Sequence, residues 1–167
     1  MLIRAETEQD RHAVYDVNAA AFATPAEAIL VDALREQAQP VVSLVAEDDG
    51  EIVGHIMLSP VSLSAHPELK VMGLGPMAVS PGQQRQGIGS ALVRAGLEQS
   101  RRQGFIAVVV LGHADYYPRF GFSPASQFGI DSEYEVPDAV FMAIELQIGA
   151  LSGKYGRVKY HPAFNNV

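Results

Sequence analysis

Residues 73–104 constrain the fold of this chain most strongly, because they predict a strand, a glycine-containing loop and a helix in direct succession. The first four amides of a helix lack acceptors within the helix, and the helix dipole places about half a positive charge beside them. Gly87 and Gly89 carry no β-carbons that would keep an anion away from those amides. Gln84 and Arg85 can add side-chain donors at the rim of the loop. The stretch therefore predicts a phosphate-binding site at the start of the helix.

Two better-known phosphate-binding loops do not fit the same residues. A dinucleotide-binding G-x-G-x-x-G fingerprint that began at Gly87 would need its third glycine at position 92, where Leu92 stands. A P-loop would need a Gly-Lys-Ser/Thr sequence, which this loop lacks. The alternative without a ligand is a simple tight connection between a strand and a helix, which glycines also suit.

The length and composition of the chain fit a single domain that spans residues 1–167. Its 48% of apolar residues can fill one substantial core. No apolar run approaches the ~20 residues that span a bilayer, and the N-terminal sequence does not have the pattern of a signal peptide. The chain contains no cysteine, which suits a reducing cytosol, so we expect a cytoplasmic protein.

The charged residues exclude some classes of ligand. The net charge of −7 argues against nucleic acid as a partner, because nucleic-acid binding depends on cationic patches. A phosphorylated ligand would therefore depend on a local positive field, from the helix N-terminus and Arg85. The histidines do not have the mutual spacing of a zinc site, and we expect no metal; those compared are His12, His55, His66 and His161.

Hydrophobic periodicity and helix-start signals predict an α+β chain. Thr7 with Asp10, and Thr24 with Pro25, are start signals for two early helices. Their predicted apolar faces are Val14, Val17 and Ala21 in the first helix, and Ile29, Leu30, Ala33 and Leu34 in the second. A third helix is predicted over about residues 87–103, and strands over residues 2–5, 41–47, 52–63, 74–80, 105–111, 139–148 and 156–160.

Two connections predict how these strands pair. The Asp-Gly within residues 48–51 predicts a hairpin between the second and third strands. The helix over residues 87–103 forms a crossover from strand 74–80 to strand 105–111, so these two strands should be parallel neighbours. Strand 105–111 is apolar almost throughout, as expected for a strand covered on both faces. We therefore predict a mixed sheet with helices on both sides.

Two segments of the chain resemble the GNAT superfamily of N-acetyltransferases. Residues 84–89, Gln-Arg-Gln-Gly-Ile-Gly, match its Q/R-x-x-G-x-G/A signature and follow a Met-Ala-Val strand. Residues 116–122, Tyr-Tyr-Pro-Arg-Phe-Gly-Phe, resemble its aromatic-Tyr-x-x-x-Gly-Phe segment. One helix and one strand join the two segments, so the resemblance covers residues 70–125, and the tail 149–164 resembles a subgroup of bacterial GNAT proteins.

The resemblance implies a fold, an activity and a co-substrate. The fold is a mixed, mostly antiparallel sheet with a central parallel strand pair and helices on both faces. The activity is the transfer of an acetyl group from acetyl-CoA to a primary amine, which attacks the thioester directly. The strand before the glycine loop is expected to splay from its neighbour, so that the backbone of Met77, Ala78 and Val79 pairs with the pantetheine arm. The residues implied around the pyrophosphate are Gln84, Arg85, Gln86, Gly87, Ile88, Gly89 and Ser90.

Tyr117 occupies the position of the family's general acid, four residues before the glycine of Gly-Phe. Aminolysis of a thioester expels a thiolate with a reference pKa near ~8.5, and its departure is helped by protonation. A phenol with a pKa of about 10 can donate that proton and is neutral before the step. The predicted catalytic residue is therefore Tyr117 and not the adjacent Tyr116.

The sequence leaves open which base deprotonates the incoming amine. Strand 74–80 offers no carboxylate for this role. His113, Glu27 on the early helices, and a chain of water molecules are the alternatives. Residues 111–115 also lack an asparagine that contacts the co-substrate in many family members, so His113 or Asp115 replaces that contact, or no residue does.

Rival functions remain at this point. A non-catalytic acyl-CoA-binding or regulatory module on the same fold would keep residues 84–89 without needing Tyr117, and an unrelated nucleotide-binding domain would leave the second segment as a coincidence. For the enzyme, the expected partner is a small-molecule or peptide amine, with neither nucleic acid nor a membrane. The acidic net charge favours a cationic amine, and segments 20–35 and 123–137 are expected to select it. Family members are frequently homodimers.

Overall fold

The computed structural model describes residues 1–167, apart from the side chain of residue 166. The strands are β1 (Leu2–Ala5), β2 (Val42–Asp48), β3 (Glu51–Leu63), β4 (Val71–Val79), β5 (Ala107–Leu111), β6 (Ser123–Pro124), β7 (Ile130–Ser132), β8 (Phe141–Glu145) and β9 (Gly156–Lys159). The α-helices are α1 (Arg11–Ala21), α2 (Ala26–Gln37) and α3 (Ile88–Arg102). Short 3₁₀ helices are η1 (Glu8–Asp10), η2 (Pro81–Gln83), η3 (Tyr117–Phe120), η4 (Ala125–Phe128), η5 (Asp138–Val140) and η6 (Pro162–Asn166). None of the helices in these described residues has the length and apolar character that crossing a membrane requires.

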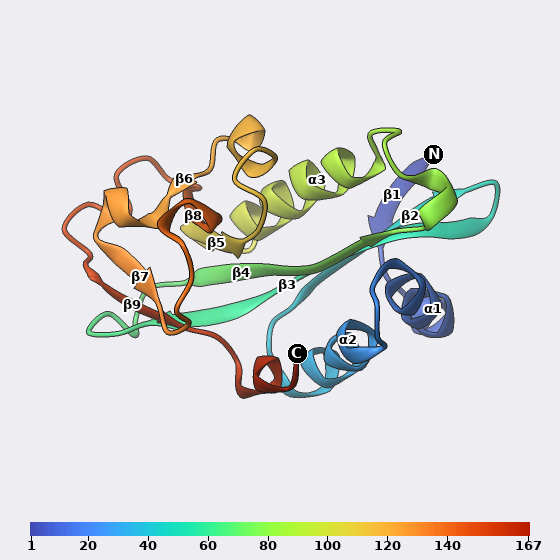
Figure 1. The fold of residues 1–167 in the computed structure, drawn as a ribbon, viewed down its shortest axis with the longest axis horizontal. Coiled ribbons are helices and arrows are strands. Elements are labelled where there is room, and N and C mark those ends of the chain that lie inside the picture. Colours follow the sequence, from blue (N-terminus) through green and yellow to red (C-terminus); the bar gives the residue numbers. More distant parts are fainter.

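The strands form a mixed sheet in the order β1-β2-β3-β4-β5-β8-β6 (Figure 1). Neighbours along this order are antiparallel except β4 and β5, which are parallel, as the crossover through α3 predicts. A second parallel pair, β7 with β9, lies off this path and joins the sheet where β9 pairs with the end of β3. The predicted fold class, a mostly antiparallel sheet with a central parallel pair, is therefore confirmed.

Helices cover both faces of the sheet. α3 packs Leu92 and Val93 against apolar side chains of β2 to β5 on one face. α1 and α2 pack Val14 and Leu34 against the opposite face, where they meet Met57 of β3. In Figure 1 α3 lies on one side of β3 and β4, and α1 and α2 lie on the other side. Elements from both layers can therefore contribute residues around the end of β4.

The buried face of α2 differs from the prediction. Ile29 is 56% exposed, whereas Val31 and Leu34 are fully buried. α2 begins at Ala26, one residue later than a cap at Thr24 predicts, although the Thr24 hydroxyl still accepts a hydrogen bond from the Ala26 amide at 3.3 Å. Packing against the sheet therefore decides which side of α2 is buried, and the apolar pattern alone did not determine this.

Several strand boundaries also differ from the prediction. β4 begins at Val71 rather than at residue 74, because it pairs with β5 from its first residue. β8 covers only Phe141–Glu145, and Ile148 is fully exposed after it. The short strands β6 and β7 have no counterpart among the predicted strands.

Candidate active site

β4 loses its neighbour β5 partway along its length. The parallel pairing ends at Leu74, and the next residue, Gly75, has a φ of +144°, which glycine adopts far more readily than other residues. β4 remains paired with β3 on its other side as far as Val79, after a shift in register. Residues 75–79 therefore have one backbone edge that no described strand occupies. We call this the free edge of β4; it is the splay that the family resemblance implies.

The first turn of α3 is open to a ligand. Gly87 is the N-cap with a φ of +85°, and nothing lies within 4 Å of the position that a Cβ would take. No side chain caps the helix, so the amides of its first turn keep their hydrogen-bonding capacity. These amides and the helix dipole fit an anionic pyrophosphate. Gly89 has a different role, since its Cβ would lie 3.2 Å from the Tyr116 hydroxyl and its absence makes room for that tyrosine.

The loop before α3 is attached to the end of β4. The Gln84 side-chain amide donates to the Val79 carbonyl at 3.2 Å, so its amide nitrogen is engaged within the protein. Arg85 has a φ of +64°, a backbone region that costs a residue with a side chain roughly 1–2 kcal/mol, and it lines the adjoining cavity. Gln86 is exposed and does not line that cavity, whereas Gln83, which was not predicted, does.

A cavity of about 1020 Å³ joins the free edge of β4 to the start of α3. Most of the predicted site residues line it, namely Met77, Ala78, Val79, Gln84, Arg85, Gly87, Ile88, Gly89, Ser90 and Tyr117. Its remaining walls come from the end of α1, the start of α2, the residues after β5, Tyr134 after β7 and the segment after β9. The two motifs that lie apart in the sequence thus face one space, which we treat as the candidate active site.

Tyr117 is a buried tyrosine whose ring is fixed on several sides. It begins η3, is 8% exposed, and lies nearly perpendicular to Tyr116 and Phe122, with ring centroids 5.1 and 5.6 Å away. Gly112 contacts the same ring, and a Cβ there would overlap it. The Tyr116 hydroxyl lies 3.3 Å from Ser90 Oγ, whereas no hydrogen bond among the described residues uses the Tyr117 hydroxyl. The phenol of Tyr117 is therefore held in place but left unpaired.

The protonation state of Tyr117 follows from its burial. Burial raises the pKa of Tyr117 to about 12, and the neighbouring Tyr116 acts in the same direction. The phenol is therefore neutral, with its proton in place, at physiological pH. The site offers a proton donor in the cavity that the free edge of β4 also lines.

Both protein groups considered as the general base line this cavity. His113 is exposed, and its backbone carbonyl accepts hydrogen bonds from the amides of Tyr116 and Tyr117 at 3.1 and 3.4 Å. Glu27 is half-buried in the first turn of α2, and its Oε1 is buried without a hydrogen-bond partner. Asp115 does not line the cavity. His113 and Glu27 are therefore the two candidate side chains that line the cavity.

Part of the cavity is lined by four aromatic residues that were not predicted. We call Phe22, Tyr134, Tyr160 and Phe164 the aromatic wall. The Tyr160 ring lies 5.8 Å from that of Tyr134 and 5.2 Å from that of Phe164, centroid to centroid. Segments 20–35 and 123–137 contribute Phe22 and Tyr134, but half of the wall comes from the C-terminal segment. The sequence contains these aromatic residues in its C-terminal tail, but no local pattern indicates that they lie near α2.

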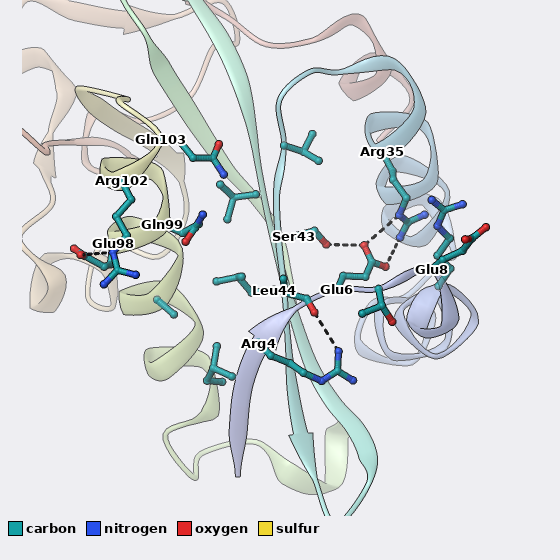
Figure 2. A pocket seen from close by; sticks show the side chains of 17 residues that line it. Arg4, Glu6, Glu8, Arg35, Ser43, Leu44, Glu98, Gln99, Arg102 and Gln103 are labelled. Carbon is teal, nitrogen blue, oxygen red and sulfur yellow. Dashed lines mark hydrogen bonds and ion pairs between the residues drawn. The ribbon is translucent and has the colours of Figure 1, made fainter.

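A separate cavity of about 570 Å³ lies near the C-terminal end of α3 (Figure 2). Its charged side chains are largely paired: Arg35 holds Glu6 at 2.6 Å, Ser43 donates to Glu6 at 2.8 Å, and Arg102 holds Glu98 at 3.0 Å. It shares no lining residue with the larger cavity and contains none of the predicted site residues. The larger cavity is therefore the candidate active site.

Comparison with known sequences assigns the family. Residues 11–122 match the model of the acetyltransferase (GNAT) family. The chain is 36% identical over 166 residues to the uncharacterized N-acetyltransferase YhbS of Escherichia coli K12, covering 99% of each chain. It is 38% identical over 135 residues to the uncharacterized N-acetyltransferase YjhQ of the same organism, covering 78% of this chain and 75% of that protein.

Solved structures of similar proteins have the same fold. The crystal structure of E. coli YhbS in complex with CoA superposes with a TM-score of 0.92 at 35% identity, covering 98% of this chain and 91% of that chain. A GNAT family acetyltransferase from Brucella melitensis in complex with acetyl-CoA gives a TM-score of 0.80 at 37% identity, covering 98% and 97%. Both relatives hold the type of co-substrate that the sequence predicts here. The chain is therefore an N-acetyltransferase of the GNAT family.

Proposed function

We propose that the protein transfers the acetyl group of acetyl-CoA to a primary amine by direct attack, with Tyr117 as the general acid. The observation that carries this proposal is the placement of Tyr117. Its buried, unpaired phenol lines the same cavity as the free edge of β4 and the first turn of α3. The complexes of the two similar proteins with CoA and acetyl-CoA support this cavity as the co-substrate site.

The walls of the cavity suit the different parts of acetyl-CoA. The unpaired amides of the first turn of α3, with Arg85 beside them, suit the pyrophosphate. Along the free edge of β4, the backbone N–H and C=O of Met77 and the N–H of Val79 are offered to the amides of the pantetheine arm, because the backbone groups of Ala78 face β3 and the Val79 carbonyl accepts from Gln84. An arm that pairs along this edge lies in the cavity that Tyr117 also lines, so both parts of the proposal use one continuous space.

The chemistry requires one proton to be removed and one to be supplied. The neutral nitrogen of the amine attacks the thioester carbon, a C–N bond forms, and the C–S bond breaks. Tyr117 donates its phenolic proton to the departing sulfur, so CoA leaves as the thiol. The surplus proton of the amine passes to His113, to Glu27 or to water, and Tyr117 regains a proton from solvent.

A pKa of about 12 makes Tyr117 a weaker acid than a free phenol. The same burial also disfavours a free thiolate, because desolvation acts against every charged form. The site therefore raises the proton affinity of the sulfur and of the phenol together. Tyr117 remains protonated across the physiological range, which keeps the general acid ready before each turnover.

Replacement of Tyr117 by phenylalanine tests the proposal. Tyr117→Phe removes the hydroxyl and keeps a ring that can pack on Phe122. We expect kcat for CoA release with a panel of primary amines to fall about 10²–10⁴-fold, while calorimetric titration gives a Kd for acetyl-CoA near that of the wild type. Tyr116→Phe is the matched control and should retain most of the activity. A Tyr117→Phe variant that turns over at the wild-type rate would exclude Tyr117 as the acid.

A further inference from the structure

We propose that the amine acceptor carries a second cationic group, which Glu27 and the aromatic wall bind. This inference rests on the proposed transfer to an amine, and it identifies Glu27 as the residue that determines acceptor specificity. The acceptor class is a small molecule with one reacting primary amine and a separate ammonium or guanidinium group. The unpaired polar groups of the cavity point to this class.

Glu27 places a carboxylate without a partner in the cavity. It lies in the first turn of α2 and lines the cavity, and its Oε1 is buried with no hydrogen-bond donor. The ion pairs among the described residues do not include it. A carboxylate oxygen that is removed from water and left unpaired costs free energy. A bound cation would offset this cost.

The two arginines of the cavity do not pair with Glu27. The guanidinium carbon of Arg119 lies 4.5 Å from the centre of the Tyr116 ring, and its Nε donates to the Tyr116 carbonyl at 2.9 Å. Arg85 belongs to the loop that leads into Gly87 and the first turn of α3. Neither arginine forms an ion pair with Glu27. The Glu27 carboxylate is therefore left for a cation on the acceptor.

The aromatic wall can hold a cation beside Glu27. Tyr160 is 9% exposed, and the phenol oxygens of Tyr134 and Tyr160 are buried without hydrogen-bond partners. η6, which carries Phe164, packs against α2, which carries Glu27 (Figure 1). Aromatic faces attract ammonium and guanidinium groups, most strongly where water is excluded. Glu27 and the aromatic wall thus line one cavity from elements that pack together, and a cation bound there can meet both.

The group bound by Glu27 is distinct from the reacting nitrogen. An amine attacks the thioester only as the neutral base, and contact with a carboxylate stabilises the ammonium form and so raises the pKa of the amine. Binding of the reacting nitrogen by Glu27 would thus oppose the chemistry. A second cation elsewhere on the acceptor has no such conflict. Glu27 then binds the remote charge, and proton removal is left to His113 or to water.

The test uses acceptors that differ at one end only. Primary amines with a four-, five- or six-carbon chain end in an ammonium, a hydroxyl or a carboxylate group. They are compared by kcat/KM and by calorimetric binding to the enzyme saturated with CoA. For the wild type we expect the ammonium member to exceed the hydroxyl member by about 10- to 100-fold, mainly through KM, and the carboxylate member to be the poorest acceptor.

Variants of Glu27 test whether this residue determines the preference for the ammonium member. Glu27→Gln should lower kcat/KM of the ammonium member to that of the hydroxyl member, and Glu27→Lys should turn the preference toward the carboxylate member. Glu36→Gln is the matched control, because Glu36 lies on the same helix, is exposed and does not line the cavity. It should leave the wild-type preference unchanged.

The outcomes separate this inference from the proposed function. A wild type without preference for the ammonium end overturns the inference. So does a Glu27→Gln variant that slows all members equally, a result that would assign Glu27 to proton removal instead. Charge-dependent binding without turnover would support the Glu27 site and contradict the proposed function. Turnover without any charge preference would support the proposed function and contradict the Glu27 site.

Discussion

The Nε2 atom of His55 on β3 lies 2.8 Å from the hydroxyl oxygen of Ser43 on β2, and this contact sets the position of the proton on a buried imidazole. The Ser43 hydroxyl donates its single proton to Glu6 at 2.8 Å (Figure 2), so it accepts from the Nε2–H of His55. The Asn18 amide donates to the other ring nitrogen, Nδ1, at 3.1 Å. Arg35 holds Glu6 at the end of this chain of contacts. A neutral histidine thus links both early helices to the sheet.

His55 makes the stability of the protein fall in acid. Burial, with a smaller contribution from the charge of Arg35, lowers the pKa of His55 to about 3. In the unfolded chain the same group binds a proton near pH ~6.5. Below that pH the unfolded state gains a proton that the folded state does not bind, so the free energy of unfolding decreases as the pH falls toward about 3. Well below pH ~6.5 the loss is about 1.4 kcal/mol per pH unit, and between pH ~6.5 and pH ~5 it is about 1.6 kcal/mol, because half of the unfolded chains already bind the proton at pH ~6.5.

The prediction is checked by urea denaturation of the wild type and of His55→Gln between pH ~6.5 and pH ~5, which gives the free energy of unfolding of each protein. Glutamine can donate and accept hydrogen bonds but does not titrate. The variant should be less stable than the wild type above pH ~6.5, and its free energy of unfolding should decrease less on acidification. Parallel pH profiles for the two proteins would contradict a neutral, buried His55.

Ser90 allows the phosphate site to be separated from the stability of α3. It is the third residue of the helix and lines the cavity. An aspartate there would stabilise the helix through its dipole by about 0.3–1 kcal/mol, yet it would repel a pyrophosphate. We expect Ser90→Asp to have a melting temperature no lower than that of the wild type and to bind acetyl-CoA on the order of tenfold more weakly. Ser90→Asn is the control of similar shape without the charge. Equal Kd values for the two variants would place the pyrophosphate elsewhere.

Gly87 and Gly149 form a matched pair for testing the open space at the start of α3. Their φ values are +85° and +84°, and a Cβ would meet nothing within 4 Å at either position. Alanine should therefore impose similar backbone strain at both, about 1–2 kcal/mol. Only Gly87 lines the cavity. We expect both variants to lose similar thermal stability and only Gly87→Ala to lose affinity for acetyl-CoA in calorimetric titration. Equal affinities would mean that this space does not receive the co-substrate.

The turns and the crossover could be predicted because single residues decide the backbone there. Asp49 and Gly50 adopt φ values of +49° and +79°, the left-handed conformation that Asp-Gly favours in a two-residue hairpin. The parallel pairing of β4 with β5 follows from the helix between them and the handedness of such crossovers. The start of α3 is likewise decided by a single residue, because its N-cap Gly87 adopts a left-handed backbone conformation. These features needed no knowledge of distant contacts.

Long-range packing decided the features that the sequence did not reveal. Ile29 and Leu34 were both predicted to be buried, but contact of α2 with β2 and β3 turns Ile29 outward. The aromatic wall is assembled when β9 pairs with the end of β3 and carries Tyr160 and Phe164 toward α2. The Gln84 amide, expected as a ligand donor, instead donates to a carbonyl of β4. Each of these outcomes depends on residues far away in the chain, so no local pattern signals it.

Gly112 positions the proposed general acid without taking part in the chemistry. A Cβ at this position would overlap the Tyr117 ring, so Gly112→Ala must displace the ring while its hydroxyl remains intact. A displacement of about 1 Å can cost on the order of 10²-fold in rate. We therefore expect kcat to fall by about that factor, with the Kd for acetyl-CoA near the wild-type value. Gly82→Ala is the control, because Gly82 has open space for a Cβ and no left-handed φ. If Gly112→Ala changed the near-ultraviolet spectrum of the tyrosines but kept the wild-type kcat, the position of Tyr117 would not govern the reaction, and the general-acid role would fail with it.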